Sequence, residues 1–398
     1  MQETTDAQTP GPSARAEAAP LELREVTKVY PGQERPAVDH LSLEVPAGEI
    51  CVLVGPSGCG KTTAMRMVNR LIEITSGDIL IAGKSVNDFK PAELRREIGY
   101  AIQQIGLFPH WTIAQNISTV PRLLGWPKER VNERVNELLD LISLPREVAK
   151  RYPAQLSGGQ RQRVGVARAL AADPPLLLMD EPFGAIDPIN RERLQNEFLR
   201  LQAEIRKTIV FVTHDIDEAI KMGDRIAVLK EGGHLAQYAP PAELLMAPAD
   251  EFVEQFVGAD RALKRLALQR VRDVDLVKVA LIRPGEPVAE ARAKCDDSDV
   301  DLAMLIDDEG RPQGWLSERA FTGERVRKEL RSPAEPIIDL DDVLRDALGR
   351  LLAAESRYGP VVDARGRMAG VLSMDVISHS LQVPAEETRT GADLVADE

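Results

Sequence analysis

The segment Gly55–Thr62 has the composition of a loop that holds phosphate groups. It reads Gly-Pro-Ser-Gly-Cys-Gly-Lys-Thr, fits the pattern G-x-x-x-x-G-K-[ST], and lies between an apolar stretch and a helical pattern. Glycines let backbone N–H groups turn toward the β- and γ-phosphates, and Lys61 adds a full positive charge. We therefore predict a nucleotide site rather than an ordinary glycine-rich turn, with the Thr62 hydroxyl on Mg²⁺. The predicted nucleotide contacts are Gly55, Pro56, Ser57, Gly58, Cys59, Gly60, Lys61, Thr62 and Thr63.

Two carboxylates follow the apolar stretch at 175–179. Asp180 is placed to hold Mg²⁺ through its water shell, and Glu181 to orient, or take a proton from, the water that attacks the γ-phosphate. A strand that simply ends in solvated acids is the alternative, and it would be favoured if this segment stood alone. The glycine loop upstream favours the catalytic interpretation.

A second anion-binding helix start is predicted at Ser157-Gly158-Gly159-Gln160, ahead of a helix over 161–171. Free N–H groups and the positive end of the helix dipole would face a phosphate there. The two loops begin different helices in different subdomains, so one chain cannot easily close both on one nucleotide. We therefore predict a homodimer in which each Ser157 loop completes the site of the other chain.

His214 ends the apolar stretch at 209–213, where it could hydrogen-bond a γ-phosphate oxygen. A single histidine at a strand end is more often structural, and the sequence leaves both roles open.

The elements that must position these residues alternate between strand and helix patterns from about residue 21 to 245. This alternation predicts an α/β domain with a largely parallel sheet. The stretches 49–54, 175–180 and 209–213 are nearly all apolar, as expected of strands buried on both faces, with their carboxyl ends toward the ligand. Between about 105 and 156 the pattern becomes helical, for example over 131–144, which predicts an inserted helical subdomain.

An internal repeat with an offset of 56 residues follows about residue 262. The stretch 306–317 resembles 362–373, including Asp307 and Asp363 and the Gly-Arg pairs that begin three residues after each. Each copy predicts helix, strand, glycine turn, strand and helix, so we expect a pseudo-symmetric pair.

Composition narrows the class of protein. The 398 residues carry a net charge of -13, which argues against nucleic acid as a partner. No apolar run approaches the length needed to cross a bilayer, and three widely spaced cysteines predict neither disulfides nor a zinc site. We expect a cytoplasmic protein with a disordered leader over 1–20 and a disordered acidic tail over 383–398.

The order GPSGCGKTT, LSGGQ, LLLMDEP and THD resembles the ATPase subunit of an ABC transporter over about 21–262. The resemblance implies a P-loop NTPase cassette with a mixed sheet and a helical subdomain at about 105–160, which hydrolyses ATP with Mg²⁺. It further implies that Tyr30 stacks on adenine, that Gln103 senses Mg²⁺ and water and contacts the membrane subunit, and that Asp187 bridges the two sites. The chain has Gly184-Ala185-Ile186 before Asp187 where the family usually has Ser-Ala-Leu, which leaves the acid in place.

The helical subdomain, with QQIGLFPH at 103–110 and PRLLGWP at 121–127, is similar to importer subunits for glycine betaine, choline, carnitine and related quaternary amines. The repeat resembles an α+β tandem CBS module over 270–382, divided into 270–325 and 326–382. Modules of this kind that hold adenosine ligands commonly carry an acid where this chain has Ala320 and Val376, while Asp375 lies one position early. Nucleotide binding by the module is therefore in doubt.

The resemblance implies integral membrane permease subunits as partners, an indirect link to a substrate-binding protein, and a place on the inner face of the bacterial plasma membrane. Three alternatives are an importer of another small solute, a soluble ABC ATPase of DNA repair or translation, and a sensor with a vestigial ATPase. The soluble ATPases usually carry two cassettes or long coiled coils, which this chain lacks, and the acids Asp180 and Glu181 argue against a vestigial ATPase.

Overall fold

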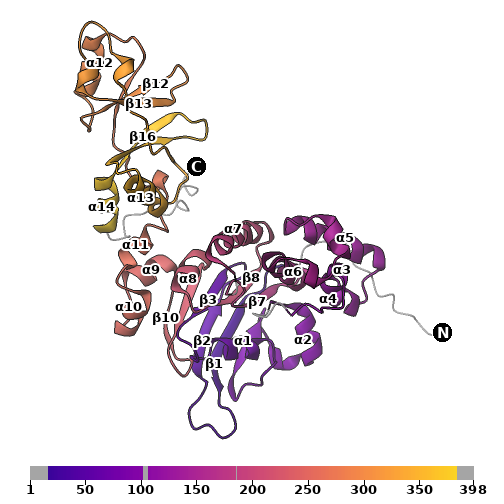
Figure 1. The fold of residues 1–398 in the computed structure, drawn as a ribbon. Helices are drawn as coiled ribbons and strands as arrows, with labels where there is room; N and C mark the ends of the chain where they lie inside the picture. Colours follow the sequence, from indigo (N-terminus) through magenta and orange to yellow (C-terminus); the bar gives the residue numbers. More distant parts are fainter. Residues whose placement is uncertain (1–16, 102–105, 185, 383–398) are drawn as a thin grey trace, which may run out of the picture. The chain divides into compact units, whose positions relative to one another are not determined.

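The computed structural model describes residues 17–101, 106–184 and 186–382, and the chain divides into two compact units (Figure 1). The first unit extends to Leu244 and includes Pro248–Phe256, and the second combines Leu245–Ala247 with the chain from Val257 onward. The leader that we predicted as disordered over 1–20 is packed at Ala19, which is 6% exposed and donates its backbone N–H to Pro175 O. The acidic tail and Gln103 lie outside the described residues.

The first unit contains a six-stranded sheet in the order β10-β9-β3-β8-β7-β6. Its strands are β3 (Ile50–Val54), β6 (Ile98–Ala101), β7 (Leu176–Asp180), β8 (Thr208–Val212), β9 (Arg225–Leu229) and β10 (Leu235–Ala239). All neighbours are parallel except β10 with β9. Every residue of β3, β7 and β8 is buried, which explains their almost wholly apolar sequences.

An antiparallel sheet in the order β2-β1-β4-β5 accompanies the first. Its strands are β1 (Leu21–Lys28), β2 (Val38–Val45), β4 (Ser76–Ile81) and β5 (Lys84–Ser85). One apolar core cluster draws on both sheets and on α1 (Lys61–Val68), the helix that follows the glycine loop. The domain therefore contains both parallel and antiparallel strands. The prediction of a largely parallel sheet is correct for the six-stranded sheet and not for the four-stranded one.

Helices fill the chain between β6 and β7, as the helical pattern predicted (Figure 1). They are α3 (Ile113–Ile117), α4 (Thr119–Leu123), α5 (Lys128–Leu141) and α6 (Gly158–Leu170). Helix α6 begins three residues before the predicted start, because Ser157 and Gln160 form a reciprocal capping box. The other helices of this unit are α2 (Pro91–Glu97), α7 (Pro188–Ile205), α8 (Ile216–Met222) and α10 (Glu251–Val257), while α9 (Pro241–Met246) spans the division between the units.

A buried cation lies at the entry of β8. The side chain of Lys207 is 1% exposed, and its Nζ lies 2.9 Å from Asp173 Oδ1, ahead of β7. Arg134 of α5 reaches the same carboxylate at 3.9 Å. The cluster thus joins the two strands that lead to Glu181 and His214 with a helix of the inserted subdomain.

Asp173→Asn is expected to destabilise the first unit by about 3–5 kcal/mol, because the buried charge of Lys207 would lose the carboxylate that lies 2.9 Å from its Nζ. The measurement is the urea midpoint of that unit's unfolding, followed by tryptophan fluorescence. Asp140→Asn, which breaks the exposed ion pair with Arg146 at 2.6 Å, is the control and should shift the midpoint much less. Equal shifts in the two variants would contradict this reading of Lys207.

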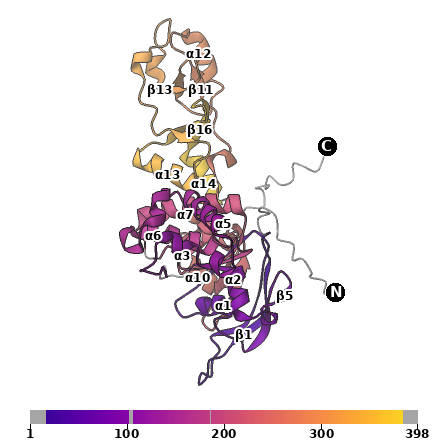
Figure 2. The ribbon, with the colours of Figure 1, turned by 90° about the vertical axis from the view of Figure 1, so that its right-hand side faces the viewer.

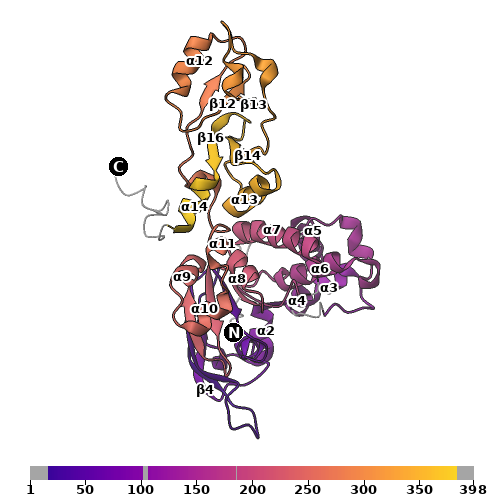
Figure 3. The same cartoon turned by 60° about the vertical axis from the view of Figure 1, so that its left-hand side comes forward.

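The second unit contains two three-stranded sheets of the same topology, β11-β12-β13 and β14-β15-β16. Their strands are β11 (Ala280–Ile282), β12 (Ala303–Ile306), β13 (Pro312–Leu316), β14 (Ile338–Asp339), β15 (Tyr358–Val362) and β16 (Met368–Ser373). In each, the first strand is parallel to the second and the second is antiparallel to the third. Figures 2 and 3 group α12 (Val288–Cys295) with the first sheet, and α13 (Leu344–Ala353) and α14 (Met374–Gln382) with the second.

The two hairpin turns have matching geometry. Asp307 Oδ1 accepts from the backbone N–H of Arg311 at 2.8 Å, and Asp363 Oδ1 accepts from that of Arg367 at 2.9 Å. The copies differ after the hairpin, because the α-helix α14 follows β16, whereas β13 is followed by two 3₁₀ turns, at Glu318–Ala320 and Lys328–Leu330. The closing helix predicted for the first copy was therefore wrong.

Candidate nucleotide-binding site

The glycine loop connects β3 to α1, so it lies at the carboxyl end of a central strand. Lys61 is 6% exposed, and its Nζ donates to Gly55 O at 2.7 Å and to Pro56 O at 2.9 Å. Gly60 has a φ of +101°, and a Cβ there would lie 2.4 Å from Ala37 O. A side chain at this position would collide with the backbone, so glycine is required for the loop to close.

Thr62 and Asp180, predicted 118 residues apart as ligands of one ion, meet in the structure. Thr62 Oγ1 donates to Asp180 Oδ1 at 3.2 Å. Burial raises the pKa of Asp180, and the hydrogen bond from Thr62 acts in the opposite direction. A hydroxyl and a carboxylate oxygen are the hard donors that Mg²⁺ prefers, so this pair fits the ion.

Glu181 and His214 are brought together because β7 and β8 are parallel neighbours. His214 Nδ1 lies 3.1 Å from Glu181 Oε1, and the Glu181 backbone N–H donates to Val212 O at 2.9 Å. Glu181 has a φ of +43°, a conformation that is costly for residues other than glycine. Such backbone strain concentrates at functional sites, which favours a chemical role for this carboxylate.

Ser157 is the N-cap of α6, with its Oγ accepting from Gln160 N at 3.3 Å. Asp187 caps α7 in the same way and accepts from Asn190 N at 3.1 Å. The two helix starts line one hollow of about 480 Å³, together with Gly158 and Gly159. Ser157 is predicted to face the nucleotide of the other chain, and Asp187 is predicted to bridge the two sites. Both residues therefore lie on one concave surface of the same chain.

The predicted adenine partner Tyr30 lies just beyond β1, and Lys28 Nζ lies 5.2 Å from its ring centroid. Sequence reasoning missed Gln162, which is 8% exposed and donates its Nε2 to Pro182 O, directly after Glu181. No sequence signal identified it, because only the structure shows that this polar side chain of α6 is buried.

Comparisons with known proteins agree with this geometry. The family model described as ABC transporter matches residues 38–184, which include the glycine loop, Ser157 and Glu181. The chain is 50% identical over 367 residues to an osmoprotectant import ATP-binding protein of Salmonella typhimurium, covering 91% of this chain and 96% of that protein. This chain is the ATP-binding subunit of an ABC transporter. It therefore binds ATP and hydrolyses it, and the predicted family, cassette fold and activity are confirmed.

Further relatives of this ABC ATPase include the choline transport ATP-binding protein of Bacillus subtilis, 46% identical over 371 residues, with 91% of this chain and 97% of that protein covered. Among solved structures, a dimeric bacterial ABC transporter cassette is 35% identical with a TM-score of 0.50, covering 56% of this chain and 98% of that one. A cassette from Clostridium perfringens, part of an ABC transporter complex, has a TM-score of 0.54 at 25% identity and covers 63% of this chain and 94% of that one. Among the helices that the structure describes, none has the length and apolarity of a bilayer-spanning segment.

Proposed function

We propose that this chain powers the import of a quaternary amine such as glycine betaine, choline or carnitine, as one of two identical ATPase subunits. The observation that carries the proposal is the extent of the match to an osmoprotectant import subunit, because 50% identity over 91% of this chain reaches beyond the cassette into the C-terminal unit. A spermidine/putrescine import subunit of Nitrosospira multiformis is 41% identical over 81% of the chain, which makes a polyamine the second candidate.

In the proposed mechanism, the glycine loop and Lys61 hold the β- and γ-phosphates, and Tyr30 stacks on adenine. Thr62 and Asp180 would hold Mg²⁺, Gln103 is proposed to sense the ion and its water, and the ion would supply positive charge to the transferred phosphoryl group. Glu181 orients the attacking water. His214 lies beside that carboxylate and can donate to a γ-phosphate oxygen.

The homodimer is proposed because Ser157 and Lys61 each begin a helix, and both helix starts are suited to the same γ-phosphate. Each Ser157 segment, comprising Ser157, Gly158, Gly159 and Gln160, then completes the site of the twin chain. Asp187 bridges the two sites from the same concave surface. Closure around two nucleotides and reopening after hydrolysis supply the conformational change that import requires.

The proposed partners are integral membrane permease subunits, which place the ATPase on the inner face of the plasma membrane, with a substrate-binding protein acting indirectly. The surface formed by the residues that follow Gln103 suits contact with a permease, because the Phe108 side chain is exposed there. The backbone at Phe108 is held in place, because its N–H donates to the buried Asn116 Oδ1 at 2.7 Å. We further propose that residues 270–325 and 326–382 form a tandem CBS-type module, in line with their matching sheets and turns.

The test is affinity capture of the tagged chain from solubilised membranes of its own cell, followed by uptake assays in vesicles containing the captured complex. We expect a polytopic membrane protein in the complex and ATP-dependent uptake of radiolabelled glycine betaine or choline. Uptake of spermidine alone would favour the polyamine candidate. A stable complex with nucleic acid and no membrane protein would overturn the proposal.

A further inference from the structure

Helix α6 is hydrogen-bonded directly to the segment that carries Glu181. The donor is Gln162 Nε2 and the acceptor is Pro182 O, one residue beyond the carboxylate. Gln162 is 8% exposed, so water cannot easily replace this bond when it breaks. A change in the position of α6 therefore acts on the backbone next to Glu181.

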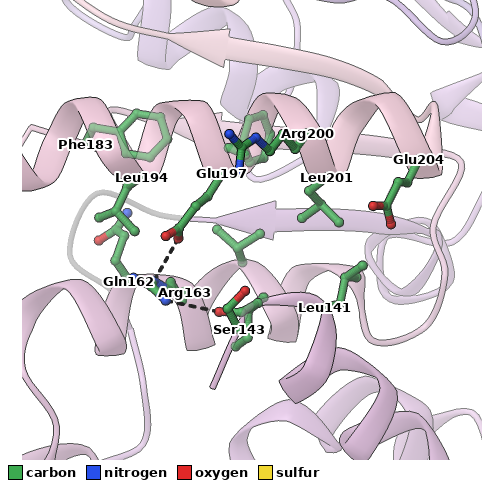
Figure 4. A pocket seen from close by; sticks show the side chains of 13 residues that line it. Leu141, Ser143, Gln162, Arg163, Phe183, Leu194, Glu197, Arg200, Leu201 and Glu204 are labelled. Atoms are coloured by element: carbon green, nitrogen blue, oxygen red, sulfur yellow. Dashed lines mark hydrogen bonds and ion pairs between the residues drawn. The ribbon is translucent and has the colours of Figure 1, made fainter. Parts of the chain in front are cut away.

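The packing around this bond is incomplete on one side. A cavity of about 210 Å³ separates α6 from α7, and Figure 4 shows Phe183 and Leu194 on its α7 side and Gln162 and Arg163 on its α6 side. Across it, Arg163 Nε lies 3.3 Å from Glu197 Oε2. Where this cavity lies, the two helices make no dispersion contacts, so the polar bonds contribute more to fixing their separation there.

The same helix begins at the segment proposed to face the nucleotide of the twin chain. Gln162 follows the N-cap Ser157 by five residues, which is about one and a half helical turns. A rigid helix of this length carries a displacement at Ser157 to Gln162. The N-terminus of α6 is thus proposed to bind the nucleotide of the other chain, while Gln162 in its second turn contacts Pro182, next to Glu181 of its own chain.

We propose that Gln162 is a positioning residue that ties Glu181 of one site to the Ser157 segment of the other. This inference rests on the proposed dimer. When the dimer closes on the twin's γ-phosphate, α6 moves and Gln162 carries Pro182 and Glu181 with it. Glu181 therefore reaches its water-orienting geometry only when the neighbouring nucleotide is in place.

The test uses Gln162→Met in the full-length chain, because methionine keeps the length of the side chain and removes the amide donor. We expect kcat for ATP hydrolysis to fall about ten- to a hundredfold, as for a slightly misplaced catalytic group, with KM changed by less than about twofold. In a Glu181→Gln background, Gln162→Met should still form the ATP-bound dimer in size-exclusion chromatography, because the Ser157 segment is intact.

The matched control is Gln202→Met. Gln202 is also 8% exposed and donates its amide to backbone carbonyls, Gly48 O at 3.1 Å and Lys207 O at 2.6 Å, but it does not join α6 to the Glu181 segment. We expect wild-type kcat from this variant. An equal loss of kcat in the two variants would show a general effect of losing a buried amide and would overturn the proposal.

Gln162→Glu provides a second test that does not depend on the methionine variant folding. An ionised carboxylate cannot donate to Pro182 O, whereas the protonated acid can, and burial raises the pKa of such a group. The ratio of its kcat to that of the wild type should therefore rise as the pH falls from 8 to 6.

A wild-type kcat for Gln162→Met would overturn the proposal, as would a wild-type kcat for Gln162→Glu at pH 8, where the carboxylate cannot donate. Loss of the ATP-bound dimer in the double variant would also overturn it, since Gln162 would then act on the Ser157 segment itself. If Glu181→Gln alone forms no dimer with ATP, the proposed dimer itself is wrong, and this result does not depend on the residue at position 162.

Discussion

Lys61→Ala is expected to lose nearly all ATP turnover. The ammonium group is the one full charge that the glycine loop directs at the phosphates, and it is held in place by the carbonyls of Gly55 and Pro56. Removing such a group from a preorganised anion site costs at least about 10²–10³-fold in kcat. ATP affinity should fall as well, because the charge acts on the ground state. Phosphate release and calorimetric titration with ATP measure the two effects.

Lys90→Ala is the control for this change, because the Lys90 side chain is largely exposed and pairs only loosely with Glu93, at 3.5 Å. It should hydrolyse ATP at the wild-type rate. A Lys61→Ala chain that turned over ATP within about tenfold of wild type would show that the backbone N–H groups alone bind the phosphates.

Glu181→Gln is expected to bind ATP normally and to hydrolyse it at least about 10²-fold more slowly, because the amide cannot accept a proton from the attacking water. Glutamine has the same shape, so the backbone at a φ of +43° and the contact with His214 can be retained. The ATP-bound dimer should accumulate. Single-turnover hydrolysis and light scattering with and without ATP measure these two outcomes.

The control here is Glu192→Gln, an exposed carboxylate on α7 whose partner Lys221 lies 3.5 Å away. It should leave both the rate and the oligomeric state unchanged. Wild-type turnover by Glu181→Gln would remove this carboxylate from the mechanism and would favour His214 as the group that orients the water.

Much of the site could be predicted from sequence because its chemistry is encoded in short segments. The glycine loop needs residues adjacent in the chain, and Asp180 and Glu181 follow directly from a strand whose apolar sequence is easily recognised. Parallel strands place their carboxyl ends at one edge, which is why Glu181 and His214 meet although 33 residues separate them.

The contacts of Gln162 and Lys207 could not be predicted in this way. Each joins segments that are distant in the chain, and its partner is a backbone carbonyl or a loop carboxylate, neither of which is marked by side-chain type as the partner of a particular buried residue. A buried lysine or glutamine is unusual, but the sequence alone does not reveal which polar residue of a helix or loop is buried.

At two positions, the start of α6 and the end of the first repeat copy, local sequence features explain where the helices begin and end. The early start of α6 follows from Ser157 and Gln160 in capping-box spacing, which outweighs the low helix propensity of the two glycines between them. In the second unit, Gly323 with a φ of +92° follows the 3₁₀ turn in the first copy, whereas no glycine interrupts α14. The repeat therefore conserves its hairpins more closely than its final helices.

The presence of Ser157 and Glu181 on a single polypeptide also has a genetic consequence. If each chain lends one segment to its twin, a cell that expresses wild-type and Glu181→Gln alleles equally would assemble half of its dimers as mixed pairs, and every such pair would contain a disabled half. The mutant allele would then be dominant, and ATP turnover in the cell would fall by more than the share of mutant transcripts implies.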